Sequence, residues 1–256
     1  MTALHAVTAA PLRVRVTRPG DCCGTCPLPN VCESGEAMLP RALVDSVVER
    51  RSLEAGATLY TAGQKRCSIW VVSAGALKTC EVDPEGREQV VGFHGPGDVL
   101  GLDRIEVPKH RGFAVTLEPT RVCRIPVSRL LARLAERPEM WRDLLRVAGR
   151  QLARGREMHR VLGQLQTGQR LAWFLLDAAG GIGECAACGC MAGRAIRLPM
   201  QRQDIASFLG MTLETVSRSV SALQKEGLIE VHGRIITLKD PARLATKFAA
   251  THCVAA

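Results

Sequence analysis

Short apolar segments alternate with glycine-bearing turns between residues 53 and 126. The sequence Asp83-Pro84-Glu85-Gly86 separates two such segments and has the chemistry of a tight hairpin turn. Many short strands with frequent turns are typical of a sandwich, barrel or roll. A short amphipathic helix is expected just before them, over about residues 40–51. The expected strands are 58–60, 68–72, 76–82, 88–93, 113–117 and 121–125.

Helical spacing of the apolar residues replaces this pattern from Ser128 to about Gln166. A helix that starts near Pro138 would have about 28 residues and a length of ~42 Å. Steps of four and three along it define a seam of apolar and small residues, which suits a modest, switchable dimer. Packing of the same seam against its own domain fits the periodicity equally well. The seam positions are Trp141, Leu145, Ala148, Leu152, Gly155, His159 and Leu162.

A helix-turn-helix pattern follows a loop that is rich in Gly and Cys. The segment Gln203 to Leu209 is a short amphipathic helix, Gly210 is a turn residue, and Thr212 is placed to cap a second helix. Two short apolar runs, 227–231 and 234–238, then predict a β-hairpin. The sequence therefore predicts a winged helix-turn-helix, an architecture that reads duplex DNA.

The second helix of this unit has one apolar and one polar face. The polar residues begin in its first turn, where a recognition helix meets base edges in the major groove. Arg218 can donate two hydrogen bonds to guanine, Glu214 can accept one from cytosine, and Ser217 can contact either a base or the neighbour of a thymine methyl group. A helix pair with a polar outer face and no role in DNA binding would show the same alternation. The apolar face carries Leu213, Val216, Val220 and Leu223, and the polar face carries Glu214, Ser217, Arg218 and Ser221.

The charge of the chain also favours a polyanionic partner. Lys and Arg number 34 against 25 Asp and Glu, a net charge of +9. Nearly all of this excess lies in residues 121–170, which hold 12 Arg and 4 acidic residues. With 3 Trp, 1 Tyr and 5 Phe, the chain has too few aromatic residues for base-stacking platforms, so duplex DNA is the expected nucleic acid. A solvated, arginine-rich helix face is the alternative.

Several functional classes are excluded by the sequence. No apolar stretch approaches the roughly 20 residues that span a bilayer, so no membrane partner is expected. Basic residues follow the apolar ones at the start of the chain, the wrong order for a secretory signal, and we expect a cytoplasmic protein. No nucleophile elbow, phosphate loop or His-Glu metal motif occurs, so we do not expect an enzyme.

Eleven cysteines in a reducing compartment point to metal ligation, redox chemistry or simple burial. Cys23, Cys26 and Cys32 offer three thiolates within ten residues, and Cys123 is the candidate fourth ligand. A four-cysteine zinc site and a [4Fe-4S] cluster fit this spacing about equally, and unliganded cysteines remain an alternative. The adjacent Cys22 could replace Cys23. Cys185, Cys188 and Cys190 form either a second metal or redox site or a plain loop, and Cys67, Cys80 and Cys253 are interpreted as core or tail residues.

These motifs together resemble the CRP/FNR superfamily of bacterial transcription regulators. The resemblance rests on Gln203-Asp204-Ile205-Ala206 followed by residues 210–218, Gly-Met-Thr-Leu-Glu-Thr-Val-Ser-Arg, and on Gly75-Ala76-Leu77 and Gly97-Asp98-Val99-Leu100-Gly101 in the roll. It covers about residues 23–245. The implied fold is α+β with four parts: a cysteine-bearing N-terminal arm (1–35), a β-roll sensor domain of the cyclic-nucleotide-binding type (36–130), a long dimerisation helix (131–168) and a winged helix-turn-helix DNA-binding domain (169–256).

The sequence Glu-x-x-Ser-Arg resembles the FNR branch, whose half-site is TTGAT in an inverted repeat. This resemblance implies that Glu214, Ser217 and Arg218 read bases, and that Cys23, Cys26, Cys32 and Cys123 hold an oxygen-labile [4Fe-4S] cluster. It further implies a homodimer when the cluster is intact, control of anaerobic genes, and RNA polymerase as a partner. Glu157 matches a family carboxylate at the dimer seam, where two facing charges would oppose pairing. An exposed Glu among arginines is the alternative interpretation.

A cyclic nucleotide is not expected as a ligand. The family members that bind one hold its phosphate through an Arg-Ser or Arg-Thr pair, whereas Gly112 follows Arg111 here. Two other functions remain open. One is a zinc or thiol redox switch on the same scaffold, and the other is a small-molecule-binding roll that acts through protein contacts alone.

Overall fold

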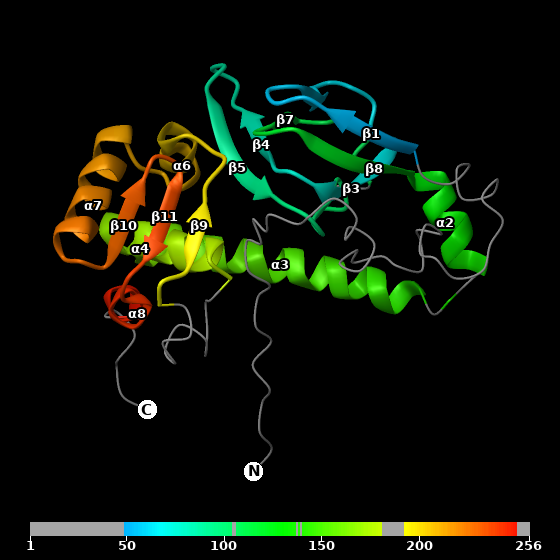
Figure 1. Cartoon of the computed structure of the whole chain (residues 1–256). Coiled ribbons are helices and arrows are strands. Elements are labelled where there is room, and N and C mark those ends of the chain that lie inside the picture. Colours follow the sequence, from blue (N-terminus) through cyan, green and yellow to red (C-terminus); the bar gives the residue numbers. More distant parts are fainter. Residues whose placement is uncertain (1–48, 104–105, 137, 139, 181–191, 250–256) are drawn as a thin grey trace, which may run out of the picture. The chain divides into compact units, whose positions relative to one another are not determined.

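A computed structural model describes residues 49–103, 106–136, 138, 140–180 and 192–249 (Figure 1). These residues form two compact units, and the boundary between them falls between Gln151 and Leu152, within helix α3 (Met140–Gln164). No helix in the described part of the chain is long and apolar enough to cross a membrane.

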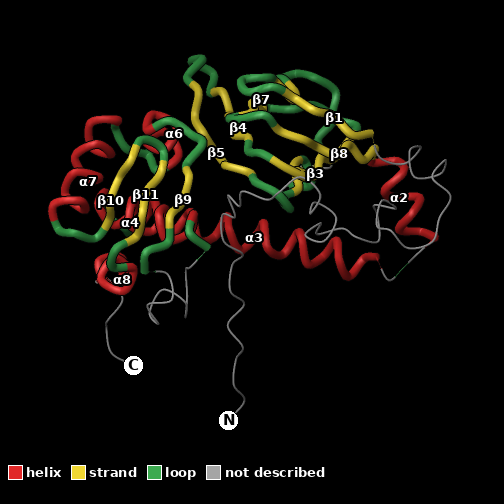
Figure 2. The backbone as a smooth tube through the Cα atoms, viewed as in Figure 1, coloured by secondary structure: helices red, strands yellow, loops and turns green. Residues whose placement is uncertain are grey.

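The first unit is the predicted β-roll, made of two four-stranded sheets (Figure 2). The strand orders are β1-β8-β3-β6 and β2-β7-β4-β5, and every paired strand is antiparallel to its neighbour. The strands are β1 (Glu49–Leu53), β2 (Thr58–Tyr60), β3 (Ser68–Ala74), β4 (Leu77–Val82), β5 (Glu88–His94), β6 (Val99–Leu100), β7 (Gly112–Thr116) and β8 (Thr120–Pro126). All six predicted strands are present.

The expected helix over residues 40–51 is wrong at its end, because residues 49–51 belong to strand β1. Residues 40–48 lie outside the described part of the chain. The whole of β1 pairs with β8, from Glu49 opposite Arg124 to Leu53 opposite Thr120. Pairing with a strand more than sixty residues away therefore overrides the local helical pattern.

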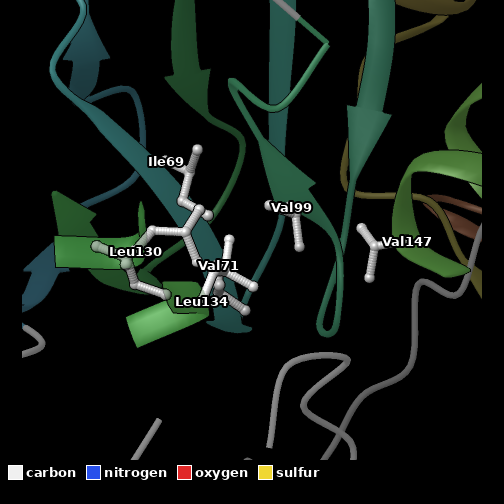
Figure 3. Packing of buried hydrophobic residues seen from close by; sticks show 7 residues of the cluster. Ile69, Val71, Val99, Leu130, Leu134 and Val147 are labelled. Atoms are coloured by element: carbon white, nitrogen blue, oxygen red, sulfur yellow. The ribbon is translucent and has the colours of Figure 1, made fainter. Parts of the chain in front are cut away.

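The two faces of the sheet that contains β3 have separate cores, because side chains alternate along a strand. Trp70 and Val72 point between the two sheets, where they meet Leu77 and Ala114 of the opposite sheet. The other face of β3 packs against helix α2 (Val127–Glu136) and α3 (Figure 3). This second core contains Ile69, Val71, Val99, Ile125, Leu130, Leu134 and Val147.

The long helical region contains two helices, since α2 ends at Glu136 and α3 begins at Met140. The predicted start near Pro138 and length of about 28 residues compare with an observed length of 25. The amide of Trp141 donates to the carbonyl of Pro138 in the first turn of α3.

The second unit contains a winged helix-turn-helix, as predicted. Its elements beyond α3 are α4 (Thr167–Ala178), β9 (Ala195–Arg197), α6 (Arg202–Phe208), α7 (Leu213–Lys225), β10 (Ile229–His232), β11 (Ile235–Leu238) and α8 (Pro241–Ala249). The three strands form an antiparallel sheet with the order β10-β11-β9, which is the wing. Gly233, with φ of 61°, joins β10 to β11. Strand β9 and helix α8 were not expected from the sequence.

Candidate nucleic-acid interface and metal centre

The predicted cap of the recognition helix is present. The side-chain hydroxyl of Thr212 accepts a hydrogen bond of 3.1 Å from the amide of Thr215, so α7 begins at Leu213. Gly210 has a φ of 60°, a conformation that glycine adopts without strain, and it makes the turn from α6. Thr212 satisfies one of the amides that every helix leaves open at its start.

The polar face of α7 is exposed as the sequence predicts. The side chains of Glu214 and Arg218 are 76% and 71% exposed and form an ion pair of 3.7 Å. Ser217 lies between them in sequence and is half-buried. At such exposure the ion pair contributes little to stability. Replacing it by contacts to bases therefore costs little free energy.

The apolar face of α7 differs from the prediction at one position. Val216, Val220 and Leu223 are buried, whereas Leu213 is 48% exposed. Leu213 is the first residue of the helix, ahead of the point at which α7 meets the rest of the unit. It therefore presents an apolar side chain beside Glu214, at the end of the helix that would enter a groove.

Arg170 supports the turn between α6 and α7, a role that the sequence did not indicate. Its Nη1 donates to the carbonyl oxygens of Leu209 at 3.0 Å and Gly210 at 3.4 Å. Its Nε and Nη2 each donate at 2.9 Å to the carbonyls of Leu165 and Leu162 at the end of α3. One guanidinium on α4 therefore joins the end of the long helix to the turn that positions the recognition helix.

The wing carries a small cluster of charged side chains. Glu230 on β10 accepts from His232 at 2.9 Å and forms an ion pair with Lys239. The Lys239 ammonium, followed by His232, lowers the pKa of Glu230 below its usual value. Lys239 thus compensates the negative charge of Glu230 on the wing.

The predicted seam of α3 contains exposed apolar residues. Trp141, Leu145 and Leu152 are 45%, 66% and 67% exposed. Gly155 and His159 are also exposed, and Ala148 and Leu162 are half-buried. Large apolar side chains at these spacings on one helix are typical of a surface that a partner covers.

Glu157 has partners inside its own chain. Its carboxylate forms an ion pair with Arg160 one turn later on α3. It also accepts a hydrogen bond of 3.1 Å from Nε1 of Trp173 on α4. The Glu157 side chain is 24% exposed, so it is not the freely solvated carboxylate of the alternative interpretation. Whether it opposes dimerisation stays a prediction.

The predicted metal ligands are only partly within the described residues. Cys22, Cys23, Cys26 and Cys32, and likewise Cys185, Cys188 and Cys190, lie outside them. Cys80 is buried, as interpreted, whereas Cys67 is exposed at the end of the loop before β3 and is not a core residue. Within the described ranges, no group of three or more His, Cys, Asp or Glu side chains could hold a metal ion.

The position of Cys123 is compatible with its predicted role as the fourth metal ligand. It lies on β8, is half-buried on the face that α2 and α3 cover, and forms no disulfide among the described residues. Arg50 of β1 is its direct strand partner. A set of four thiolates suits an iron-sulfur cluster or zinc.

The absence of a hydroxyl at position 112 has a packing reason. A Cβ atom on Gly112 would lie 1.8 Å from the carbonyl oxygen of Cys80 on the neighbouring strand β4. A serine or threonine therefore cannot replace Gly112 unless β7 and β4 move apart. Arg111 before it is exposed.

Two protein families match the chain, one within each of the two units. The family described as "Cyclic nucleotide-binding domain" matches residues 50–137, and the family described as "Crp-like helix-turn-helix domain" matches residues 169–247.

Two similar proteins have the names of regulators. The chain is 33% identical over 237 residues to "Transcriptional activator protein FnrA" of Stutzerimonas stutzeri, covering 90% of this chain and 93% of that one. It is 30% identical over 250 residues to "Fumarate and nitrate reduction regulatory protein" of Salmonella typhi, covering 94% and 97%. Among solved structures, FixK2 from Bradyrhizobium japonicum is 29% identical with a TM-score of 0.68, covering 82% of this chain and 100% of that one.

Proposed function

Because this chain belongs to the CRP/FNR family of transcription regulators, we propose that it controls anaerobic gene expression in response to oxygen. It is a regulator and not an enzyme. It acts in the cytoplasm as a homodimer on duplex DNA, at an inverted repeat of TTGAT half-sites. The names of two relatives, an activator called FnrA and a regulator of fumarate and nitrate reduction, support the anaerobic role.

The exposed polar face of α7 is the observation that carries the proposal. Arg218 donates to guanine, Glu214 accepts from a cytosine amine, and Ser217 contacts an adjacent base. Glu214 and Arg218 lie one turn apart in the first turns of the helix, and their exposed ion pair is weak enough to be replaced by contacts to bases. The Thr212 cap leaves the start of α7 well ordered for insertion into a major groove.

The apolar seam of α3 supports the homodimer. Covering Trp141, Leu145 and Leu152 removes apolar surface from water and favours association. The imperfect heptad, with Gly155 and His159 on the same seam, makes this association modest. A modest dimer is one that a signal elsewhere in the chain can strengthen or weaken.

Cys23, Cys26, Cys32 and Cys123 would hold the [4Fe-4S] cluster. When bound, the cluster would supply a centre that oxygen converts or destroys. Through this ligand set Cys123 would tie the arm to β8, and the face of β8 that carries Cys123 packs against α2 and α3. Ordering of the arm at this face would therefore bear on the helix that carries the seam.

No cyclic nucleotide is part of the proposed mechanism. The close approach of β7 to β4 at Gly112 supports this, because it leaves no room for a phosphate-binding hydroxyl. RNA polymerase is the proposed protein partner on the DNA.

DNA recognition is tested by fluorescence anisotropy under anaerobic conditions. The duplex carries two TTGAT half-sites with centres about one helical turn (~10 bp) apart. We expect specific binding that weakens steeply with salt, and a loss of about tenfold to a hundredfold for Arg218→Gln. Arg87→Gln, which removes the same charge from the β4–β5 turn, is the matched control. Equal affinity for the TTGAT repeat and a scrambled duplex would refute the proposed site.

The cluster is tested by iron and sulfide analysis of protein purified without oxygen. We expect ~4 iron and ~4 sulfide per chain, bleaching in air, and near-complete loss in Cys123→Ser. Cys67→Ser, also on the roll, is the control and keeps its iron. A colourless protein with ~1 zinc that is indifferent to air would replace the cluster by the zinc alternative.

A further inference from the structure

The β-roll contains a small cavity that the proposed function does not use. Its walls come from β1, β2, the loop before β3, β3, the loop before β7 and β8, and its volume is about 120 Å³. Every residue that lines it belongs to the first unit. The residues used below are Arg51, Tyr60, Lys65, Trp70, His110 and Arg124.

The size of the cavity limits what it can hold. Sites for drug-sized ligands occupy about 300–1,000 Å³, so a nucleotide does not fit. A cavity of about 150 Å³ accepts benzene. This cavity is somewhat smaller and is partly open to solvent, so a single small ring that stays partly outside it, or a short chain, is the largest ligand that it accepts.

The rim of the cavity is cationic. Arg51, Lys65 and Arg124 line it, and no acidic side chain is among its lining residues in the described part of the chain. Glu49 pairs with Arg51 at 3.0 Å and Arg124 at 2.9 Å, which leaves three cations against one carboxylate. A surplus of positive charge at a concave site favours an anion.

The inner wall is flat and aromatic. The guanidinium carbons of Arg51 and Arg124 lie 5.5 and 5.9 Å from the centre of the buried Trp70 ring. Cation–π contacts of this kind hold both cations beside an apolar surface. Tyr60 and His110 stack on each other with their ring centres 3.8 Å apart and supply a second flat surface.

The polar groups of this wall are uncharged at neutral pH. Burial raises the pKa of Tyr60 to about 12, and burial together with the Arg66 cation lowers the pKa of His110 to about 4. Tyr60 therefore stays a phenol and His110 a neutral imidazole. The charge near a bound ligand comes from the rim, from Glu49, and from Asp103 and Arg66, which both act on Tyr60 and His110.

We propose that this cavity binds a small organic anion with a flat body, whose carboxylate contacts Arg51, Lys65 and Arg124 and whose body lies against Trp70 and Tyr60. The roll would then have an effector site for a small carboxylate. The inference does not depend on the cluster, on oxygen or on the DNA sequence that the protein reads.

The cavity is separate from the predicted cluster ligand. Arg124 is the strand partner of Trp70, whereas Cys123 is the partner of Val71. Because adjacent residues of a strand point to opposite faces, the cavity and Cys123 lie on opposite faces of β8. Binding at one of them does not require the other to be occupied.

Benzoate is the probe for the test, and benzamide is its neutral match in shape. Each is titrated calorimetrically into the full chain in a buffer without other carboxylates or phosphate. We expect benzoate to bind with a Kd of about 1 mM or below, and benzamide at least about tenfold more weakly. Lys65→Gln and Arg51→Gln should each weaken benzoate binding about tenfold, because each removes a charged hydrogen-bond donor.

Arg111→Gln is the matched control, because Arg111 is exposed but does not line the cavity. It also reports on the position at which related regulators hold a nucleotide. Unchanged benzoate affinity in Arg111→Gln supports the proposal. A loss equal to that in Lys65→Gln would assign the binding to the nucleotide position and overturn it.

Cys67 gives a second readout, because its exposed thiol also lines the cavity. Benzoate should slow alkylation of Cys67 by iodoacetamide, measured on the Cys67 peptide by mass spectrometry, and benzamide should not at the same concentration. The proposal is overturned if benzoate shows no saturable binding, if benzamide binds equally well, or if neither probe protects Cys67. Unchanged circular dichroism of Lys65→Gln and Arg51→Gln establishes that both variants are folded.

Discussion

The indole Nε1 of Trp173 donates a hydrogen bond of 3.1 Å to Oε1 of Glu157, which joins helix α4 to helix α3. The same carboxylate forms an ion pair with Arg160. Trp173 is only 4% exposed, so this bond satisfies a donor that water barely reaches. The carboxylate predicted to repel its mate across a dimer seam is therefore already engaged within its own chain.

Two substitutions of Glu157 distinguish the effect of its charge from the effect of its hydrogen bond to Trp173. Glu157→Ala leaves the Trp173 donor without its acceptor and should lower the free energy of unfolding by about 1–2 kcal/mol. Glu157→Gln keeps an oxygen acceptor and should lose less than half as much. Urea unfolding followed by tryptophan fluorescence measures both.

Dimerisation of the same variants decides the predicted repulsion. If two Glu157 charges oppose pairing, both variants should strengthen the dimer of the air-exposed protein equally, because both lose the charge. Sedimentation equilibrium gives the dimerisation constants. Identical constants for the natural chain and Glu157→Gln would show that the ion pair with Arg160 has removed the repulsion.

Substitution of Arg170 by lysine should destabilise the protein. Its guanidinium donates to four carbonyl oxygens in two places, the end of α3 and the turn before α7. A lysine ammonium cannot span both places, so Arg170→Lys should cost about 2–3 kcal/mol and loosen the turn. Hydrogen exchange of the peptide that contains Gly210 and Met211 should become faster. Arg156→Gln, an exposed arginine on α3, is the control, and equal exchange in both variants would contradict this role.

Prediction from the sequence pattern succeeded for features that depend on residues close together in the sequence. The six predicted strands, the Thr212 cap and the buried positions of α7 after Leu213 are local features, and the structure contains them. Strand β1 was missed because its residues are mostly exposed, so an edge strand of this kind carries no alternation of apolar and polar positions. Its position is determined by β8, which lies far away in the sequence.

The missed role of Arg170 has a similar cause. Two of its acceptors, the carbonyls of Leu209 and Gly210, lie 39 and 40 residues further along the chain. A backbone carbonyl leaves no mark on the residue type that carries it, so no sequence pattern reveals such a contact. Within an arginine-rich stretch, Arg170 looked like one more solvated charge.

Replacing Gly112 by the serine or threonine of nucleotide-binding family members should destabilise the roll. The new Cβ in Gly112→Ser would meet the Cys80 carbonyl at 1.8 Å, so β7 must separate from β4. We expect a loss of more than about 3 kcal/mol in the free energy of unfolding, and no gain of cyclic AMP binding. Thermal unfolding and calorimetric titration measure the two effects.

Gly168 provides the control for this substitution. It lies in the first turn of α4, and no atom is within 4 Å of a Cβ placed there. Gly168→Ala should therefore be neutral or stabilise the protein by up to about 1 kcal/mol, because alanine favours the helix. A Gly112→Ser variant as stable as Gly168→Ala would show that the strands move apart easily.

His110 should make the roll sensitive to mild acid. Its pKa is lowered to about 4, chiefly because burial penalises the imidazolium and also because the Arg66 guanidinium lies beside it, while Asp103 acts in the opposite direction. In the unfolded chain the pKa of a histidine is about 6.5. Above this pH both states are neutral and His110 adds no pH dependence.

Below about pH 6.5 the unfolded chain takes up a proton that the folded chain refuses, so stability falls as the pH drops toward 4, by up to about 3 kcal/mol. His110→Gln removes the titration and should flatten the curve of urea midpoint against pH between 6.5 and 4. The variant also loses the stacking on Tyr60 at every pH, so only the slope is diagnostic. Parallel curves for the natural chain and His110→Gln would mean that His110 is protonated in the folded roll as easily as in the unfolded chain.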